Sequence, residues 1–307
     1  MNSKNKQVEL KTTNTEEIFI SYLKRKRYTG ITVNNKLGQL KIFLQWLERE
    51  NTALASCTYT DMMAFVQYMR KENMSIPNQN LYLRAVRQLY EGLMMEGMAT
   101  HNPVASLRVR GHVYRLPHNI LSMEQLQKIY DSYKPQTDYQ LRNKTILGLY
   151  INQGLMRSDV NGLLTGDINL IKGTVRIRKN IKLAERILPL AAHQVLTLQE
   201  YINTVRPRLL KQSSFEKGDR LFFTYANGQT VNEGIRQLLQ TLKKKHPELT
   251  SLHQIRTSVI ANWAKEKQIR EAQYLAGHTH LRSIQRYRDI NLQDLQESLD
   301  EHHPLKK

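Results

Sequence analysis

The chain has 307 residues, with 46 Lys and Arg against 27 Asp and Glu, which gives a net charge of +19 and an isoelectric point near 9.9. This charge favours a polyanionic partner, because Lys and Arg side chains neutralise phosphates and release condensed counterions. The polar residues 1–15, a mean hydropathy of −0.56 and the lack of a long apolar run argue against a leader peptide or a membrane protein. A single cysteine, Cys57, excludes internal disulfides and a cysteine-built zinc site, and is expected in a protein core in a reducing cytoplasm.

Residues 1–102 are expected to form one helical domain of four helices. Thr13 and Glu16 have the spacing of a capping box, which marks the start of the first helix. The fourth helix is expected to begin at Pro77, because proline is favoured in the first turn of a helix. Apolar residues at helical spacing place the four helices at about 13–23, 33–47, 60–70 and 77–98.

Residues 103–120 are expected to link this domain to a second one, since Asn102-Pro103 ends the helical pattern. From residue 104 onward the stretch is basic and contains no acidic residue. A linker that crosses DNA would carry such charge, so Arg108, Arg110 and Arg115 are candidate DNA contacts.

Ser122 and Gln125 repeat the capping-box spacing and open a second domain over residues 121–290. Alternating apolar residues over 173–190 predict a two-stranded β-hairpin. The other expected elements are a short strand at 221–223 and helices at about 138–156, 192–206, 231–244, 252–266, 269–275 and 280–288. The fold class is therefore mainly α with a small β-hairpin.

The second domain also contains histidine, arginine and tyrosine residues in a particular order and spacing. His253 and Arg256 are three residues apart and share one face of a helix. Gly277-His278 comes 22 residues after Arg256, and Tyr287 follows nine residues after His278. Each feature alone is ordinary, because a His-x-x-Arg pair is usually a surface pair, Gly-His a helix end and a tyrosine a core residue. Only their order and spacing together indicate a functional site.

This order, with lysines on the preceding hairpin, resembles the tyrosine recombinase (phage integrase) family. The resemblance covers most of residues 122–290, and the four-helix segment is similar to the family's SAM-like core-binding domain. It implies a mixed α+β catalytic domain that cuts and rejoins DNA at specific sites. The stretches 255–260 and 273–278 and the ending His303-Pro304-Leu305 look most like integrases of mobile elements in Bacteroidetes-like bacteria.

By this resemblance, Tyr287 is the nucleophile and forms a 3′-phosphotyrosine. Arg256 and His278 bind the scissile phosphate, and His253 donates a hydrogen bond to it or relays a proton. Donors preorganised around the phosphate oxygens stabilise the transition state, and a phenol with an ordinary pKa of about 10 needs cationic surroundings to become phenolate-like. A hairpin lysine would protonate the leaving 5′ hydroxyl. The phosphotyrosine keeps the energy of the broken ester, so neither a cofactor nor a metal is expected.

The sequence departs from the family at its first arginine, which follows a Gly-Leu pair three residues before an acidic residue. Met156 stands at that position, and Arg157 falls one step later, which on a helix turns a side chain by about 100°. Three explanations stay open. Arg157 reaches the phosphate through a local distortion, Arg176 or Arg178 of the hairpin supplies the charge, or the enzyme is weak or inactive.

The identity of the hairpin lysine is also open. Counted back from Arg186 and Pro189, Lys182 fits the family pattern, whereas Lys179 fits better when counted forward from Gly173. Lys182 is favoured as the general acid. Lys179 then joins Arg176 and Arg178 as a candidate DNA contact.

The implied partner is double-stranded DNA with specific recombination sites. On the fourth helix, Arg84 and Arg87 stand off the apolar stripe, and Lys36 and Lys41 are candidates on the second helix. These helices are expected to enter the major groove, so that the two domains form a C-shaped clamp on DNA. Further implications are an accessory DNA-bending protein and association with the nucleoid in the cytoplasm.

The tail, residues 291–307, carries an apolar stripe of Leu292, Leu295 and Leu299 on an acidic helix. We expect it to dock on a neighbouring protomer, so that four protomers form a ring on two DNA sites; the alternative is that it covers its own domain. Two rival functions are a topoisomerase of the same covalent mechanism and a catalytically silent DNA-binding protein. The separate core-binding domain argues against the first, and only Met156 favours the second.

Overall fold

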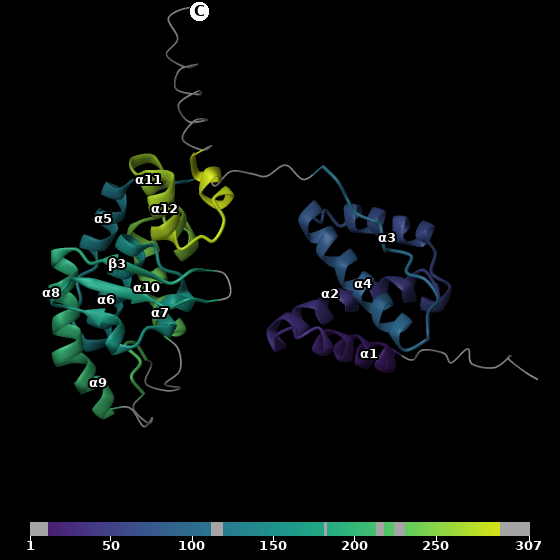
Figure 1. Ribbon diagram of the computed structural model, residues 1–307, viewed down its shortest axis with the longest axis horizontal. Coiled ribbons are helices and arrows are strands. Elements are labelled where there is room, and N and C mark those ends of the chain that lie inside the picture. Colours follow the sequence, from purple (N-terminus) through teal and green to yellow (C-terminus); the bar gives the residue numbers. More distant parts are fainter. Residues whose placement is uncertain (1–11, 112–118, 181–182, 213–217, 224–230, 289–307) are drawn as a thin grey trace, which may run out of the picture. The chain divides into compact units, whose positions relative to one another are not determined.

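The computed structural model describes residues 12–111, 119–180, 183–212, 218–223 and 231–288. The chain divides into two compact units, an N-terminal unit, Met1–Tyr114, and a C-terminal unit, Arg115–Lys307. Both are mainly helical, and the C-terminal unit also contains one small antiparallel sheet, as the sequence predicted (Figure 1). Within the described residues, no helix combines the length and apolarity that a bilayer crossing requires.

In the described part of the N-terminal unit there are four α-helices, as the sequence predicted. They are α1 (Thr12–Arg25), α2 (Gly30–Arg49), α3 (Tyr59–Lys71) and α4 (Ile76–Met95), with a 3₁₀ turn at Leu54–Ser56. Helix α4 packs against α1 and α2. The core contains an aromatic cluster in which the Phe65 ring lies 5.1 Å from Phe43 and 5.2 Å from Trp46, between centroids. Cys57 is buried in the same core, as expected.

Local hydrogen bonds set the helix boundaries in this unit. Thr58 and Asp61 form a complete capping box at the start of α3, which satisfies two of the free N–H groups at that end. Pro77 lies in the first turn of α4, as predicted. Thr13 lies inside α1, which begins at Thr12, so the observed start of the helix differs from the start after Thr13 that the sequence predicted.

The segment after α4 packs back onto the N-terminal unit. Val104, Leu107 and Val109 are buried in its core. The guanidinium of Arg87 on α4 donates hydrogen bonds to the carbonyl oxygens of Val104 (3.1 Å) and Leu107 (2.9 Å). The first part of the stretch expected as a linker is therefore held against the helical unit by both apolar contacts and a cation.

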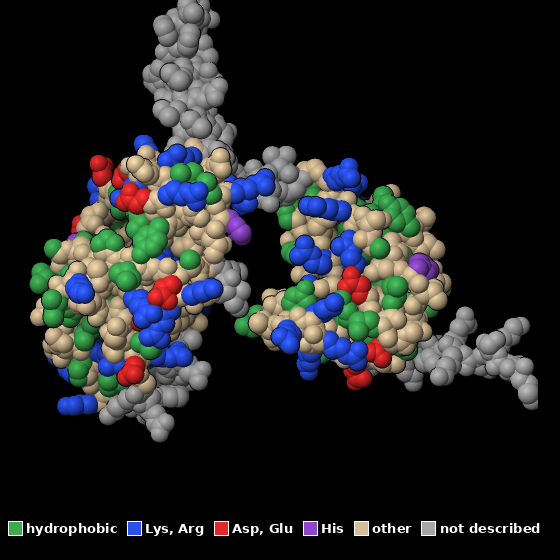
Figure 2. Space-filling model, in the orientation of Figure 1, with side chains coloured by type: hydrophobic (Ala, Val, Ile, Leu, Met, Phe, Trp, Pro, Cys, Tyr) green, Lys and Arg blue, Asp and Glu red, His purple; other side chains and the backbone are tan. Residues whose placement is uncertain are grey.

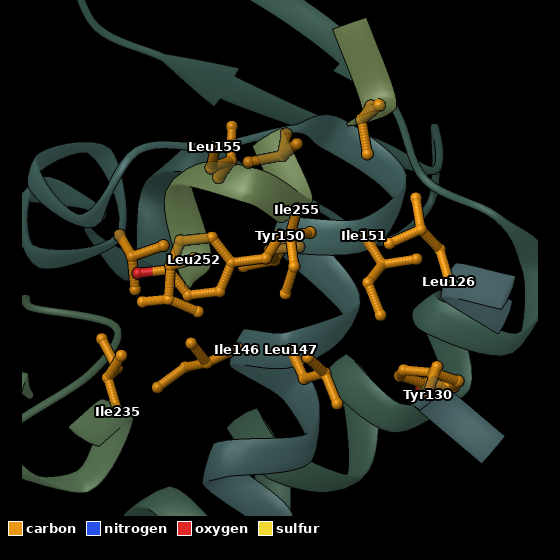
Figure 3. Packing of buried hydrophobic residues seen from close by; sticks show 14 of the residues in the cluster. Leu126, Tyr130, Ile146, Leu147, Tyr150, Ile151, Leu155, Ile235, Leu252 and Ile255 are labelled. Atoms are coloured by element: carbon orange, nitrogen blue, oxygen red, sulfur yellow. The ribbon is translucent and has the colours of Figure 1, made fainter. Parts of the chain in front are cut away.

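The C-terminal unit is built around helix α6 (Asp138–Gln153), which packs against several other helices. These are α5 (Met123–Ser132), α8 (Ala192–Glu200), α9 (Arg206–Gln212), α10 (Asn232–Lys245) and α11 (Leu252–Glu266). Figure 3 shows side chains of α6 packed between those of α5, α10 and α11: Ile146, Leu147, Tyr150 and Ile151 against Leu126, Tyr130, Ile235, Leu252 and Ile255. Helices α7 (Arg157–Gly162) and α12 (Ile269–Ala276) complete the labelled helices, and residues 282–288 are also helical.

The sheet has three strands in the order β1-β2-β3: β1 (Ile168–Asn169), β2 (Thr174–Ile177) and β3 (Arg186–Pro189). The predicted hairpin corresponds to β2 and β3, with Val175 opposite Leu188 and Ile177 opposite Arg186. The sequence did not indicate β1, because a two-residue strand has no alternating pattern. Side chains of β3 alternate between buried and exposed, which places Arg186 on the buried face.

Several elements of the C-terminal unit differ from the predictions. The segment 221–223 is buried but is not a strand; it is tied to the preceding loop by one bond, from the Leu221 N–H to the Leu163 carbonyl (2.8 Å). The helix expected to end near 206 continues through a π-helical turn, Tyr201–Val205, into α9. Helix α6 ends at Gln153, because Gly154 adopts a left-handed conformation (φ 55°).

Candidate active site

Arg256 lies inside α11 and is only 6% exposed. Its guanidinium donates one hydrogen bond to the carbonyl of Gly154 and another, of 2.9 Å, to that of Ala276. These carbonyls stand where α6 and α12 end, so one side chain joins two helix termini. Burial, with a contribution from the Arg186 charge, lowers the pKa of Arg256 to about 10, and the group stays cationic at neutral pH.

His278 follows the left-handed Gly277 (φ 70°) that ends α12. Its backbone N–H donates to the Gln273 carbonyl (3.1 Å), and its ring Nε2 lies 3.5 Å from the Arg256 guanidinium. Burial, followed by the charges of Arg256, Arg186 and Arg286, lowers the pKa of His278 to about 4. The ring is therefore neutral near pH 7 in the protein without DNA.

Tyr287 lies beside His278, with ring centroids 6.4 Å apart and planes inclined by 28°. It is half-buried in the helical segment 282–288. Burial raises the pKa of the Tyr287 phenol, while the Arg256 charge and a hydrogen bond with Thr257 act in the opposite direction. The structure thus brings together Arg256, His278 and Tyr287, three residues that the sequence selected by spacing.

His253 is placed differently from these three. It is exposed in the first turn of α11, three residues before the buried Arg256. No hydrogen bond to another described residue holds its ring, so the imidazole is free to meet a ligand from solvent.

The hairpin approaches the same site through its turn. Leu183 forms a β-bridge with His278, and the Ala184 N–H donates to the Gly277 carbonyl at 3.0 Å. The Asn180 amide donates to the Asp159 carboxylate at 3.1 Å. Lys179, the residue before Asn180, is exposed, whereas Lys182 lies outside the described residues.

Met156 is not on the long helix, so Met156 and Arg157 are not related by the 100° helical step that the sequence predicted. It is the N-cap of α7, with an extended backbone (φ −87°, ψ 159°), and Arg157 is the exposed first residue of that helix. The two hairpin arginines are half-exposed and paired: Arg176 with Glu185 at 2.9 Å, and Arg178 with Asp167 at 3.1 Å.

A buried ion pair that the sequence did not indicate lies next to these residues. Arg186 of β3 donates to Asp159 of α7 at 3.2 Å, and both side chains are almost fully buried. Asp159 also accepts the Met156 backbone N–H at 3.1 Å. The buried face of β3 could have marked Arg186 as a residue in need of a carboxylate partner, because buried charges are usually paired.

The candidate DNA contacts of the N-terminal unit fall into two groups. Lys36 is buried and its ammonium donates to the Gln88 side chain at 2.6 Å, and Arg87 binds the carbonyls described above, so neither presents a free charge at the surface. Arg84 and Lys41 are exposed, and Lys41 is 3.6 Å from Glu16. Arg108 and Arg110 are exposed as well, while Arg115 lies outside the described residues. Figure 2 shows Lys and Arg side chains on the surface of both units.

The fold and the site agree with comparisons to known proteins. The model of the phage integrase family matches residues 119–294, and the model of the phage integrase N-terminal SAM-like domain matches residues 16–98. The first match covers more than half of the chain, so the protein belongs to the phage integrase family.

Its relatives place it among the tyrosine recombinases. It is 26% identical to tyrosine recombinase XerC of Halalkalibacterium halodurans over 97% of this chain and 99% of the relative. It is 24% identical to tyrosine recombinase XerD of Listeria innocua over 91% and 94%. The chain is therefore a tyrosine recombinase, an enzyme of site-specific DNA recombination.

Solved structures share the fold at low sequence identity. XerH recombinase bound to a palindromic difH substrate matches with a TM-score of 0.72 and 16% identity, over 92% of this chain and 83% of the other. A lambda integrase dimer bound to a COC′ core site matches with a TM-score of 0.62 and 16% identity, over 96% and 79%.

Proposed function

We propose that Tyr287 cuts DNA by attacking the scissile phosphorus, while Arg256 and His278 hold the phosphate oxygens. The observation that carries this proposal is the cluster of these three side chains in a partly buried site, where an electrostatic interaction is stronger than in water. His253, exposed on the same helix as Arg256, hydrogen-bonds the phosphate or relays the proton that Tyr287 loses.

The attack forms a bond between the Tyr287 oxygen and phosphorus and breaks the bond to the 5′ oxygen. The product is a 3′-phosphotyrosine and a free 5′ hydroxyl, which takes its proton from a hairpin lysine. Attack by another 5′ hydroxyl reverses the step and rejoins the strand. In the protein without DNA, the raised pKa keeps Tyr287 protonated, and the low pKa keeps His278 neutral. A bound phosphate anion would favour the charged form of His278.

The test is a nicked suicide duplex, from which the short 5′ strand diffuses away after cleavage. The wild-type protein is expected to form a covalent adduct that survives denaturation. Tyr287→Phe should form none but should still shift the DNA in a gel. An adduct with the Phe variant would show that another residue is the nucleophile, and shifted but uncut DNA with the wild type would indicate a silent binder.

The choice between Lys182 and Lys179 has its own test. A substrate with sulfur in place of the bridging 5′ oxygen has a leaving group with a pKa of about 8.5, which needs little help from an acid. Lys182→Ala is expected to be slow on the oxygen substrate and near normal on the sulfur substrate. If Lys179→Ala shows this rescue instead, Lys179 is the general acid.

The proposed partner is duplex DNA with a defined site, held by both units. Exposed cations at Arg84, Lys41, Arg108 and Arg110 support contacts from the N-terminal unit, and Lys179, Arg176 and Arg178 from the hairpin. We place Arg115 in the same basic segment. Each phosphate contact should contribute about one unit to the slope of log affinity against log salt concentration.

We further propose that the tail, residues 291–307, docks on a neighbouring protomer in a tetramer on two DNA sites. Deleting it should leave binding to a single site nearly intact and impair the pairing of sites and strand exchange. Recombination at the full-length rate by the truncated chain would mean that the tail only covers its own unit.

The biological setting we favour is a mobile element, with the protein acting on nucleoid DNA, aided by a DNA-bending accessory protein. Sequencing the DNA beside the gene tests this proposal. Inverted repeats at the ends of a discrete insertion would support it, whereas a gene with no discrete insertion around it would count against it.

A further inference from the structure

The acidic residue that follows the position of the missing arginine forms an ion pair with a different arginine. Asp159 stands three residues after Met156, where the family pattern has its acidic residue. It is paired with Arg186, which comes from β3, 27 residues further along the chain. The Arg186 side chain has no exposed surface, and within the described residues its Nε–H has no hydrogen-bond partner.

Arg186 also lies directly against the phosphate-binding turn. A Cβ atom added to Gly277 would stand 2.6 Å from Arg186 Nη1, so only glycine allows the guanidinium this approach. Arg256 donates a hydrogen bond to the Ala276 carbonyl of the same turn. Two guanidinium groups, one from α11 and one from β3, therefore lie against the segment Ala276–His278.

We propose that Arg186 takes over from the arginine absent at Met156 as the cation beside Asp159, and that it is a positioning residue that acts through Arg256 and His278. This inference rests on the proposed function. Because the Arg186 side chain is enclosed, it does not touch the phosphate itself. It fixes Asp159, which in turn holds Asn180 of the hairpin turn, and it packs under the glycine that sets the direction of His278. Its charge also acts on Arg256 and His278.

The other candidate arginines are less well placed. Arg176 and Arg178 bind acidic residues at the hairpin surface, and Arg157 is exposed at the start of α7. Of the cations that act most strongly on His278, Arg256 and Arg186 are buried, and Arg286 is exposed next to Tyr287.

The experiment separates single-turnover cleavage of the suicide duplex from DNA affinity. In Arg186→Met/Asp159→Asn, a neutral pair replaces the ion pair, so no buried charge is left unpaired. We expect cleavage about 100-fold slower than wild type and affinity within about threefold, because affinity comes from surface phosphate contacts. Arg186→Lys, which keeps the charge beside Asp159, should recover at least part of the rate. Met156→Arg should restore cleavage in the Arg186→Met chain, a rescue that a merely structural role does not predict.

Three results would overturn the assignment. They are a wild-type cleavage rate in Arg186→Met/Asp159→Asn, no rescue by Met156→Arg in a chain that still binds DNA, or a 100-fold loss in Arg157→Ala with binding intact. The Arg157→Ala variant changes an exposed residue, so it still tests the assignment if the Arg186 variants do not fold. A wild-type protein that forms no adduct would refute the proposed function itself, before any Arg186 variant is compared.

Discussion

In the N-terminal unit, the buried ammonium of Lys36 is held by the neutral amide of Gln88 and lies over the Tyr28 ring, 5.2 Å from its centroid. In the C-terminal unit, the buried guanidinium groups of Arg256 and Arg186 bind backbone carbonyls and a carboxylate around one turn, Ala276–His278. The first arrangement leaves no charge directed at a ligand. The second gathers cations beside a tyrosine and a histidine. A buried cation is therefore a sign of a candidate active site only where several buried cations lie close to titratable side chains.

The largest expected effect comes from removing one buried cation in each unit. Arg256→Met should reduce cleavage of the suicide duplex about 1,000-fold, since it removes a preorganised phosphate donor. Lys36→Met should leave cleavage unchanged and lower the free energy of unfolding by only about 1 kcal/mol, because one hydrogen bond is lost. Equal losses of cleavage in the two variants would remove the distinction between the units.

A second comparison uses two left-handed glycines. Gly277→Ala should lower the free energy of unfolding by about 3 kcal/mol, from backbone strain plus overlap with Arg186. Gly97→Ala, at the same φ of 70° but with open space around it, should cost about 1 kcal/mol. The chain has two tryptophans, Trp46 and Trp263, one in each unit. Urea unfolding of Trp46→Phe and Trp263→Phe backgrounds reports each unit separately. Equal costs would show that Arg186 moves aside freely.

The pKa of His278 predicts a pH dependence in the C-terminal unit. The folded pKa is about 4 and the ordinary value is 6.5, so between these pH values the unfolded chain binds a proton that the folded chain does not. Stability should be full above pH 6.5 and fall as the pH approaches 4, by an amount on the order of 3 kcal/mol. Unfolding followed by Trp263 should show this fall without DNA, and His278→Asn should flatten it. An unchanged slope in that variant would assign the effect to another group.

The smallest expected effects are those of replacing Arg84 and Arg87, two arginines on α4 with different surroundings. Arg84→Ala should weaken DNA binding and reduce the salt slope by about one, as expected for a phosphate contact. Arg87→Ala should leave that slope unchanged and lower the stability of the N-terminal unit by about 1–2 kcal/mol, since its bonds to Val104 and Leu107 are lost. A reduced slope for Arg87 alone would reverse the two roles.

Helices and strands that depend on neighbouring residues in the sequence were predicted from local sequence patterns. The Ser122–Gln125 capping box starts α5, and the alternation over 173–190 gives β2 and β3. The order of Arg256, His278 and Tyr287 also selected three residues that the structure brings together, although 31 residues separate the first from the last. Here the spacing is informative because a helix, a glycine turn and a second helical segment fix the three positions.

Pairings between distant residues were not predictable in the same way. Nothing near Asp159 in the sequence points to Arg186, and the β-bridge from Leu183 to His278 depends on how the hairpin meets α12. The sequence predicts Lys36 as a DNA contact, but the fold buries its side chain beside Gln88. Amphipathic side chains such as lysine are the residues for which a helical pattern is least decisive.

The single thiol of the chain has a use that follows from its position. Cys57 is 2% exposed, and burial raises the pKa of its thiol, so a thiol reagent can reach it only when the N-terminal unit opens. The rate of labelling therefore measures local opening of that unit alone, in the full-length protein. DNA that binds this unit in its closed form should slow the labelling in proportion to site occupancy, which makes Cys57 a built-in reporter of binding without an added fluorophore.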